Sequence, residues 1–128
     1  MAERELPCCE FCHYCDAPLV RRHEHDHFPI PKAAGGTEMV PACMNCHEMK
    51  DRMPIEQWNP TFFATGLLEI LGGQPQCLLS PYEIVDGVAD YKAVWPNLSH
   101  AARLVYAKTR AAVEHHRARE TRRRAASE

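Results

Sequence analysis

Four cysteines in two short pairs are the residues of this chain best suited to hold a metal ion. They lie in Cys12-His13-Tyr14-Cys15 and Cys43-Met44-Asn45-Cys46. A CxxC turn brings two thiolates close enough to share one zinc ion, and two such turns complete a tetrahedral site. The 27 residues between the pairs leave room for an inserted hairpin. The sequence therefore predicts one structural zinc ion bound by Cys12, Cys15, Cys43 and Cys46.

The first pair has an alternative register, because Cys9-Glu10-Phe11-Cys12 is also a CxxC. We prefer the register given above, since residues 14–18 are typical of a knuckle followed by a turn. Cys8 and Cys77 are interpreted as ordinary thiols. The chain has seven cysteines, and this odd number fits four ligands plus spare thiols better than a full set of disulfides.

A second group of potential ligands lies between and just after the cysteine pairs. The stretch from His23 to Pro29 reads HEHDHFP, and His47 directly follows the second pair. Hydrolysis of a phosphodiester needs a base to activate water and a cation to stabilise the developing charge. Histidine suits the first task, and a hard divalent ion held by carboxylate and imidazole suits the second. Asp26, His27 and His47 therefore indicate metal-assisted phosphodiester hydrolysis, whereas His23 and His25 are interpreted as bystanders.

The order of these motifs resembles a known family. A CxxC, an Asp-His pair followed by prolines, a Gly-Gly and a CxxCHxxK occur in this order between Cys12 and Arg52, about a third of the chain. This order resembles the HNH (His-Me finger, ββα-metal) endonucleases that carry a CxxC/CxxC zinc ribbon. It is also similar to phage recombination endonucleases that resolve branched DNA.

The resemblance implies a role for each matching residue. Asp26 and His47 would be ligands of a catalytic divalent ion, and His27 would be the general base. Asp51, one helical turn after His47, could add a third ligand. The ion would be Mg²⁺ or Mn²⁺, although an imidazole ligand also admits Ni²⁺, Co²⁺ or Zn²⁺.

Three further residues flank these positions. Lys50 or Arg52 would contact a phosphate group of the substrate. Glu24 shares strand parity with Asp26 and is expected either near the metal or behind one of its ligands. The family's middle Asn, which braces the loop carrying the base, is missing, because no Asn occurs between His27 and Cys43.

The elements that would position these groups follow from the sequence pattern. A strand is expected within residues 19–28, a loop over 32–37, a second strand over 38–42 and a helix from Asn45 to Met53. Pro54 would end that helix. Further helices are expected over 61–71, from Ser80-Pro81 to near Trp95, and from Asn97 or Ser99 onward. Apolar residues from Trp58 to Leu71 are interpreted as helical core rather than as a base-stacking surface.

The fold class predicted from these elements is α+β. A zinc-knotted ββα-metal finger over residues 12–53 is followed by an α-helical extension over residues 54–128. The two parts are expected to form a single domain, 1–128, because the length suits one core and a structural metal would support it.

The charge of the chain is unevenly distributed. Residues 98–128 contain eight Lys/Arg and three Asp/Glu, whereas residues 1–97 contain seven and fourteen. A basic C-terminal helix is compatible with nucleic acid, although it could also be a solvated helix end. His115 and His116 are interpreted as surface residues. The residues expected to contact DNA phosphates are Arg117, Arg119, Arg122, Arg123 and Arg124.

The leading functional hypothesis is a metal-dependent HNH endonuclease that hydrolyses DNA, of the phage or mobile-element type. One alternative is a non-catalytic zinc-ribbon module that binds DNA or protein. Another is a junction-resolving nuclease that acts on branched DNA as a homodimer through the C-terminal helices. The N-terminus lacks a signal-peptide pattern, and no apolar run is long enough to cross a bilayer, so a cytoplasmic protein of a bacterium or an infected host cell is expected.

Overall fold

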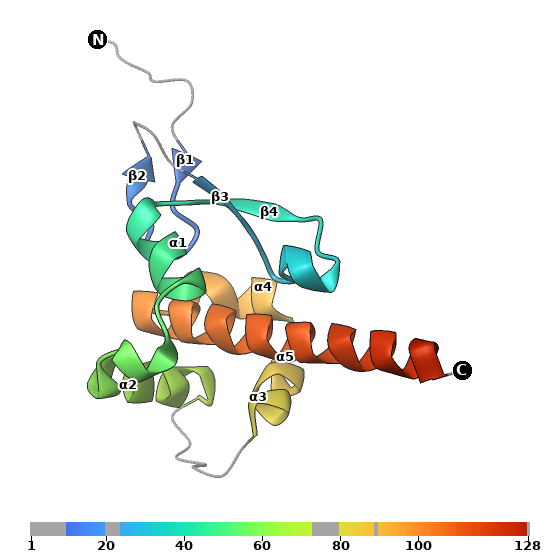
Figure 1. Ribbon diagram of the computed structural model, residues 1–128. Coiled ribbons are helices and arrows are strands. Elements are labelled where there is room, and N and C mark those ends of the chain that lie inside the picture. Colours follow the sequence, from blue (N-terminus) through green and yellow to red (C-terminus); the bar gives the residue numbers. More distant parts are fainter. Residues whose placement is uncertain (1–9, 20–23, 73–79, 89, 128) are drawn as a thin grey trace.

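The computed structural model describes residues 10–19, 24–72, 80–88 and 90–127 as a mixed α+β fold. Short strands come first and helices follow (Figure 1). The strands are β1 (Glu10–Phe11), β2 (Pro18–Leu19), β3 (Glu24–His27) and β4 (Met39–Ala42). The α-helices are α1 (Met44–Asp51), α2 (Pro60–Ile70), α3 (Pro81–Gly87), α4 (Tyr91–Val94) and α5 (His100–Ser127). Single 3₁₀ turns occur at η1 (Lys32–Ala34), η2 (Ile55–Gln57) and η3 (Trp95–Asn97).

Two small antiparallel sheets precede α1. β1 pairs with β2, and β3 pairs with β4 in a register that places Asp26 opposite Val40. The turn between β1 and β2 is closed by the amide of Asp16, which donates to the carbonyl of Cys12 at 2.9 Å. The predicted strand pair is confirmed for residues 24–27 and 39–42, while residues 20–23 of the first stretch lie outside the described part.

The helix α1 begins directly after β4. Cys43 is its N-cap, and its sulfur accepts a hydrogen bond from the amide of Cys46 at 3.4 Å. At the other end, the Lys108 ammonium donates to the carbonyls of Lys50 (2.7 Å) and Met53 (3.2 Å). A cation is favourable at a helix C-terminus, where carbonyls lack partners. The predicted helix 45–53 is confirmed to within two residues at each end.

The later helices follow their capping residues. The Asn59 side chain accepts from the first amides of α2, and Gly72 follows this helix with a φ of 69°. Ser80 and Glu83 form a capping box at the start of α3. At the start of α5, the Ser99 hydroxyl accepts from the amide of Ala102 at 3.2 Å.

The predicted single helix from Pro81 to near Trp95 is wrong. α3 ends at Gly87, and Val88 leaves the helical conformation with a ψ of 81°. Glycine propagates a helix poorly, which favours a stop at this point. The short helix α4 and the turn η3 then place Trp95 in the core, where its indole donates to the carbonyl of His13 at 3.0 Å.

The long helix α5 is the element against which most of the molecule packs. It contacts α1 and η1 as well as α2 and α3, and Figure 1 shows the first two on one side of α5 and the last two on the other. One cluster of buried side chains includes Tyr14, Phe28, Trp95 and Tyr106, so the N-terminal and helical parts share a core. Within the described ranges, no helix is both long and apolar enough to cross a membrane.

Candidate metal centres

The four predicted cysteines come together at the junction of the β1–β2 turn and the start of α1. One sulfur from each of Cys12, Cys15, Cys43 and Cys46 lies within 4.8 Å of the others. The sulfurs of Cys15 and Cys43 are 3.9 Å apart. This set of thiols could therefore hold one metal ion, and tetrahedral thiolate sites of this kind suit zinc.

Hydrogen bonds to sulfur favour the thiolate form of Cys12, whereas the hydrogen bond with Cys12 raises the pKa of Cys46 and burial raises that of Cys15. The amide of Cys43 donates to the sulfur of Cys12 at 3.3 Å. A hydrogen bond from the side chain of Cys46, followed by backbone amides, lowers the pKa of Cys12 to about 4, although burial opposes this shift. Metal binding needs deprotonated sulfur, so the local structure favours the form of Cys12 that binds metal.

The helical part of the chain also contacts this cysteine cluster. The Nε2 atom of His100, the first residue of α5, is 3.3 Å from the sulfur of Cys46. The guanidinium of Arg103 donates to the carbonyl of His13 (3.2 Å) and the carboxylate of Asp16 (3.0 Å). The sequence pattern did not identify His100 or Arg103, because 54 residues separate His100 from Cys46 and no short motif links them.

A second cluster lies where β3 faces α1. Asp26 comes from β3, and His47 and Asp51 lie one turn apart on α1, so the hairpin and the helix together bring three ligand-type side chains to one place. The Nε2 atom of His47 is 2.9 Å from Asp51 and 3.5 Å from Asp26. One ligand atom from each residue lies within 4.8 Å of the others. The structure thus brings together the three residues predicted to bind a catalytic ion.

Polar neighbours surround this carboxylate cluster. The Lys50 ammonium is 3.1 Å from Asp26 and 2.9 Å from Asp51, and its side chain is only 3% exposed. The hydroxyl of Tyr14, which is buried, donates to Asp26. Glu24 contacts the Nδ1 atom of His47, on the opposite side of the ring from the carboxylates. The expected position of Glu24 beside the cluster therefore agrees with its observed contact.

The charge state of the cluster follows from burial and from these neighbours. Burial raises the pKa of Asp26, although Tyr14 and Lys50 act in the opposite direction. Burial also acts to raise the pKa of Asp51, but the hydrogen bond and charge of Lys50, together with His47, lower it overall. The hydrogen bond to His47 lowers the pKa of Glu24. The cluster therefore combines an anionic Asp51 with a carboxyl, Asp26, whose charge is costly without a cation beside it.

His27 is the last residue of β3 and stands opposite Met39 in the sheet. Successive side chains of a strand point to opposite faces, so His27 points away from the face that carries Asp26 and Glu24. Within the described residues, no hydrogen bond or ion pair joins it to the carboxylate cluster. His25, on the same face as His27, lies 3.5 Å from Glu10. His23 lies outside the described residues, so its assignment stays a prediction.

The loop between β3 and β4 is braced by its own backbone. The amide of Phe28 donates to the carbonyl of Glu38 at 3.1 Å, and the amide of Gly36 donates to Pro31 at 2.9 Å. A Cβ on Gly36 would lie 1.8 Å from the carbonyl oxygen of Ile30, so only glycine fits there. This bracing occurs in the loop where the family's middle Asn is missing.

The predicted phosphate-binding residues occupy different environments. Lys50 is buried between two carboxylates, whereas Arg52 is exposed at the end of α1. Arg117 binds both carboxylate oxygens of Asp86, at 3.1 and 2.9 Å, and Arg123 is 2.6 Å from Glu120. Arg119, Arg122 and Arg124 are exposed. A phosphate contact by Lys50 stays a prediction that would require its ammonium to leave at least one carboxylate.

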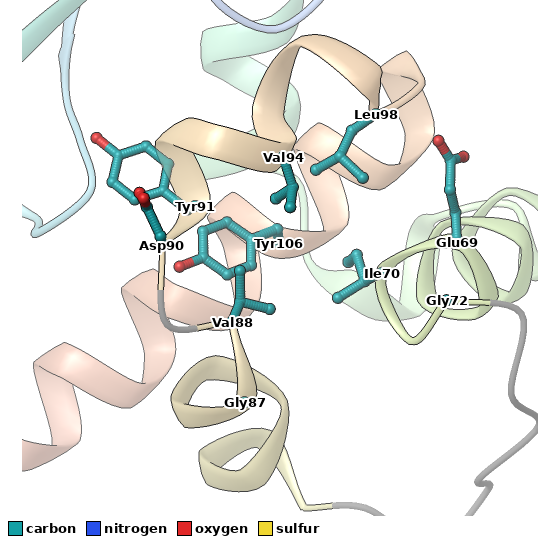
Figure 2. Close-up of a pocket in the computed structure, with 10 residues that line it drawn as sticks. All are labelled: Glu69, Ile70, Gly72, Gly87, Val88, Asp90, Tyr91, Val94, Leu98 and Tyr106. Atoms are coloured by element: carbon teal, nitrogen blue, oxygen red, sulfur yellow. The ribbon is translucent and has the colours of Figure 1, made fainter.

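An apolar pocket of about 290 Å³ lies apart from both clusters. Figure 2 shows Ile70, Val88, Val94 and Tyr106 around this space. Glu69 lies at its edge, and its carboxylate is bound to the amide and hydroxyl of Ser99. The pocket shares no residue with the metal-ligand clusters, so it is not part of the candidate site.

Within the part of the chain that the structure describes, the four cysteines of the cluster are the only ones. Cys8, Cys9 and Cys77 lie outside the described residues, so the alternative pairing through Cys9 stays untested. Comparison of the chain with protein-family models, with curated proteins and with solved structures finds no match, so its functional assignment depends on the geometry of the two clusters.

Proposed function

We propose that the protein is a metal-dependent endonuclease of the HNH, or ββα-metal, kind that hydrolyses DNA. The observation that carries this proposal is the meeting of Asp26, His47 and Asp51 within 4.8 Å, at the junction of a β-hairpin and the helix that follows it. The resemblance in motif order supports the same assignment. In this proposal the segment from Cys12 to Met53 is a zinc-knotted ββα finger, and the helices after it support that finger.

The cysteine cluster is proposed to hold a structural zinc ion. Four sulfur ligands with no open position are typical of structural rather than catalytic zinc. The metal would join the β1–β2 turn to the start of α1, and α1 carries His47 and Asp51. It would therefore fix the two ligands of α1 relative to the strand that carries Asp26.

The carboxylate cluster is proposed to hold the catalytic divalent ion. Its oxygen donors suit Mg²⁺ or Mn²⁺, and its imidazole also admits Ni²⁺, Co²⁺ or Zn²⁺. The Lys50 ammonium now compensates Asp26 and Asp51, so a divalent ion would have to displace it from these carboxylates. When bound, the ion would supply positive charge for the transition state and for the departing 3′ oxygen.

The side chains of the chain are assigned separate tasks in the proposed reaction. The resemblance assigns the base to His27, whose imidazole would have to turn from the end of β3 toward the face that carries Asp26. There it would accept a proton from the attacking water as the oxygen of that water forms a bond to phosphorus. The bond from phosphorus to the 3′ oxygen breaks, this oxygen takes a proton from a second water molecule, and the products are a 3′ hydroxyl and a 5′ phosphate. Glu24 holds the imidazole of His47 from its Nδ1 side, which leaves Nε2 directed at the carboxylates.

A second candidate function is a zinc-ribbon module that binds DNA or protein without cutting it. The position of Lys50 is the observation that favours it. Its ammonium contacts both carboxylates at about the length of a charge-assisted hydrogen bond, so the cluster is an ion-pair network without a divalent ion. Such a network could stabilise the finger alone.

Nicking of a supercoiled plasmid separates the two candidates. Wild-type protein is assayed with Mg²⁺, Mn²⁺ or Ni²⁺ and without added divalent ion, beside His27→Ala and His25→Ala. His25 is a matched control because it lies on the same strand and the same face as His27. We expect metal-dependent nicking by the wild type and His25→Ala, and a loss of about 100-fold or more in His27→Ala, since a general base contributes that much. Equal activity of the two variants would remove His27 from the mechanism.

A further inference from the structure

A hollow of about 390 Å³ lies between α1 and α5, beside the carboxylate cluster. Lys50 and Asp51 form one part of its wall, and these two residues also belong to the cluster or contact it. The remaining wall includes four residues of α5, which are Lys108, Ala111, Ala112 and His115. A long basic helix therefore borders the space from which a substrate would approach Asp51.

The four α5 residues of this hollow form one stripe along the helix. Positions 108, 111, 112 and 115 have the spacing of residues that share a helix face. The same face continues at Arg119 and Arg122, four and seven residues after His115. With 1.5 Å of rise per residue, the stripe from 108 to 122 is about 21 Å long.

The other arginines near the end of α5 either lie on another side of the helix or already contact a carboxylate. Arg117 and Arg124 are nearly opposite the stripe, at 100° per residue, and line a separate hollow with Tyr82 of α3. Arg117 is also bound to Asp86, and Arg123 to Glu120. Arg119 and Arg122 are exposed, and within the described ranges neither forms an ion pair. The positive charge that is not compensated by a carboxylate therefore lies partly on the stripe that leads to the cluster.

We propose that the face formed by His115, Arg119 and Arg122 binds the sugar-phosphate backbone of the DNA, on the strand that leads away from the scissile bond. This inference rests on the proposed nuclease function and adds a direction to it. Phosphates of one strand recur every 3.4 Å or so along the duplex axis. Residues 115–122 extend about 10 Å along α5, so this face would span about three of them. The small side chains of Ala111 and Ala112 allow the backbone to approach α5 closely beside the cluster.

The test compares two double variants that remove equal charge from neighbouring positions of α5. Arg119→Ala with Arg122→Ala alters the proposed face, and Arg117→Ala with Arg124→Ala alters the opposite one. Binding of a fluorescein-labelled 30-base-pair duplex is measured by anisotropy at several salt concentrations, without added divalent ion so that cutting does not interfere. Thermal unfolding by circular dichroism checks that each variant is folded.

The expected result is a difference between the faces. Each phosphate contact contributes about 0.9 to the slope of log K against log salt, so the stripe variant should lose about 2 from this slope and about tenfold or more in affinity. The opposite-face variant should lose less than half as much. Equal losses in the two variants, or no duplex binding by the wild type, would overturn the proposal. The wild type could also bind the duplex through Arg119 and Arg122 and yet fail to nick a plasmid. That result would refute the nuclease function but support the binding face on α5.

Discussion

At the scale of single residues, Lys50 supplies the positive charge that compensates the carboxylates of Asp26 and Asp51 when no divalent ion is bound. Its ammonium is within 3.1 Å of both Asp26 and Asp51, and both Lys50 and Asp26 are nearly inaccessible to solvent. Removing one partner of a buried ion pair leaves the other charge without compensation. We therefore expect Lys50→Met to lower the free energy of unfolding by about 3 kcal/mol in zinc-loaded protein without Mg²⁺ or Mn²⁺.

Urea unfolding measures this effect, and Lys92→Met is the matched control. Lys92 is 69% exposed and lies 3.8 Å from Glu38, so its ion pair is screened by water. The control should stay within about 1 kcal/mol of the wild type. Equal destabilisation by the two substitutions would show that the buried ion pairs of Lys50 contribute no more to the free energy of unfolding than the exposed pair of Lys92.

The sequence predicted the members of both clusters, and Glu24 beside one of them, but it did not predict the contacts of Tyr14 and His100. Asp26, His47 and Asp51 could be named because their spacing follows strand and helix periods around two CxxC pairs. The contacts of Tyr14 with Asp26 and of His100 with Cys46 span 12 and 54 residues. Such contacts depend on how separate elements pack, so no local pattern carries them.

At the scale of elements, the contact of α2 with α5 depends on Gly66. A Cβ at this position would lie 2.7 Å from a methyl group of Val105 and 2.8 Å from the carbonyl oxygen of Ala101. Gly66→Ala would therefore push the two helices apart, and overpacking of this kind costs about 1–3 kcal/mol. We expect a lower midpoint of thermal unfolding for this variant.

Gly87→Ala provides the comparison, because nothing lies within 4 Å of a Cβ at that position. It is the last residue of α3, where alanine is compatible with the helix and restricts the unfolded chain. The midpoint should stay unchanged or rise. If Gly66→Ala were as well tolerated as Gly87→Ala, the close approach of α2 and α5 would be wrong.

Helix boundaries were predictable where capping residues mark them. Ser80 with Glu83, Asn59 with Pro60 and Ser99 all stand where a helix begins. The stop at Gly87 was missed because the following residues, up to Trp95, still favour helix locally. Trp95 donates a hydrogen bond to His13 and packs in the shared core, so its position depends on the distant β1–β2 turn. Local helix propensity does not include such a contact.

At the scale of the whole molecule, the cysteine cluster connects the strands to the long helix. Its sulfurs come from the β1–β2 turn and from α1, and His100 at the start of α5 contacts Cys46. We expect Cys15→Ser to abolish the proposed zinc binding and to lower the unfolding midpoint of the whole chain, because metal binding contributes directly to folding. Cys9→Ser should keep about one zinc ion per chain, as a site of two CxxC pairs requires.

Zinc content by elemental analysis, together with circular dichroism, checks this pair of variants. The comparison also decides the register of the first CxxC. Zinc retained by Cys15→Ser and lost by Cys9→Ser would assign the site to the alternative pairing through Cys9.

The central claim is that the Asp26, His47 and Asp51 cluster binds a divalent ion that serves phosphodiester hydrolysis. The most direct measurement is plasmid nicking by zinc-loaded protein as a function of Mn²⁺ concentration, for the wild type and Asp51→Asn. We expect saturable nicking by the wild type, and a requirement for about tenfold or more Mn²⁺ in the variant, because it lacks one ligand charge. Identical Mn²⁺ dependence of the two proteins, or no nicking by zinc-loaded wild type with any divalent ion, would contradict the claim.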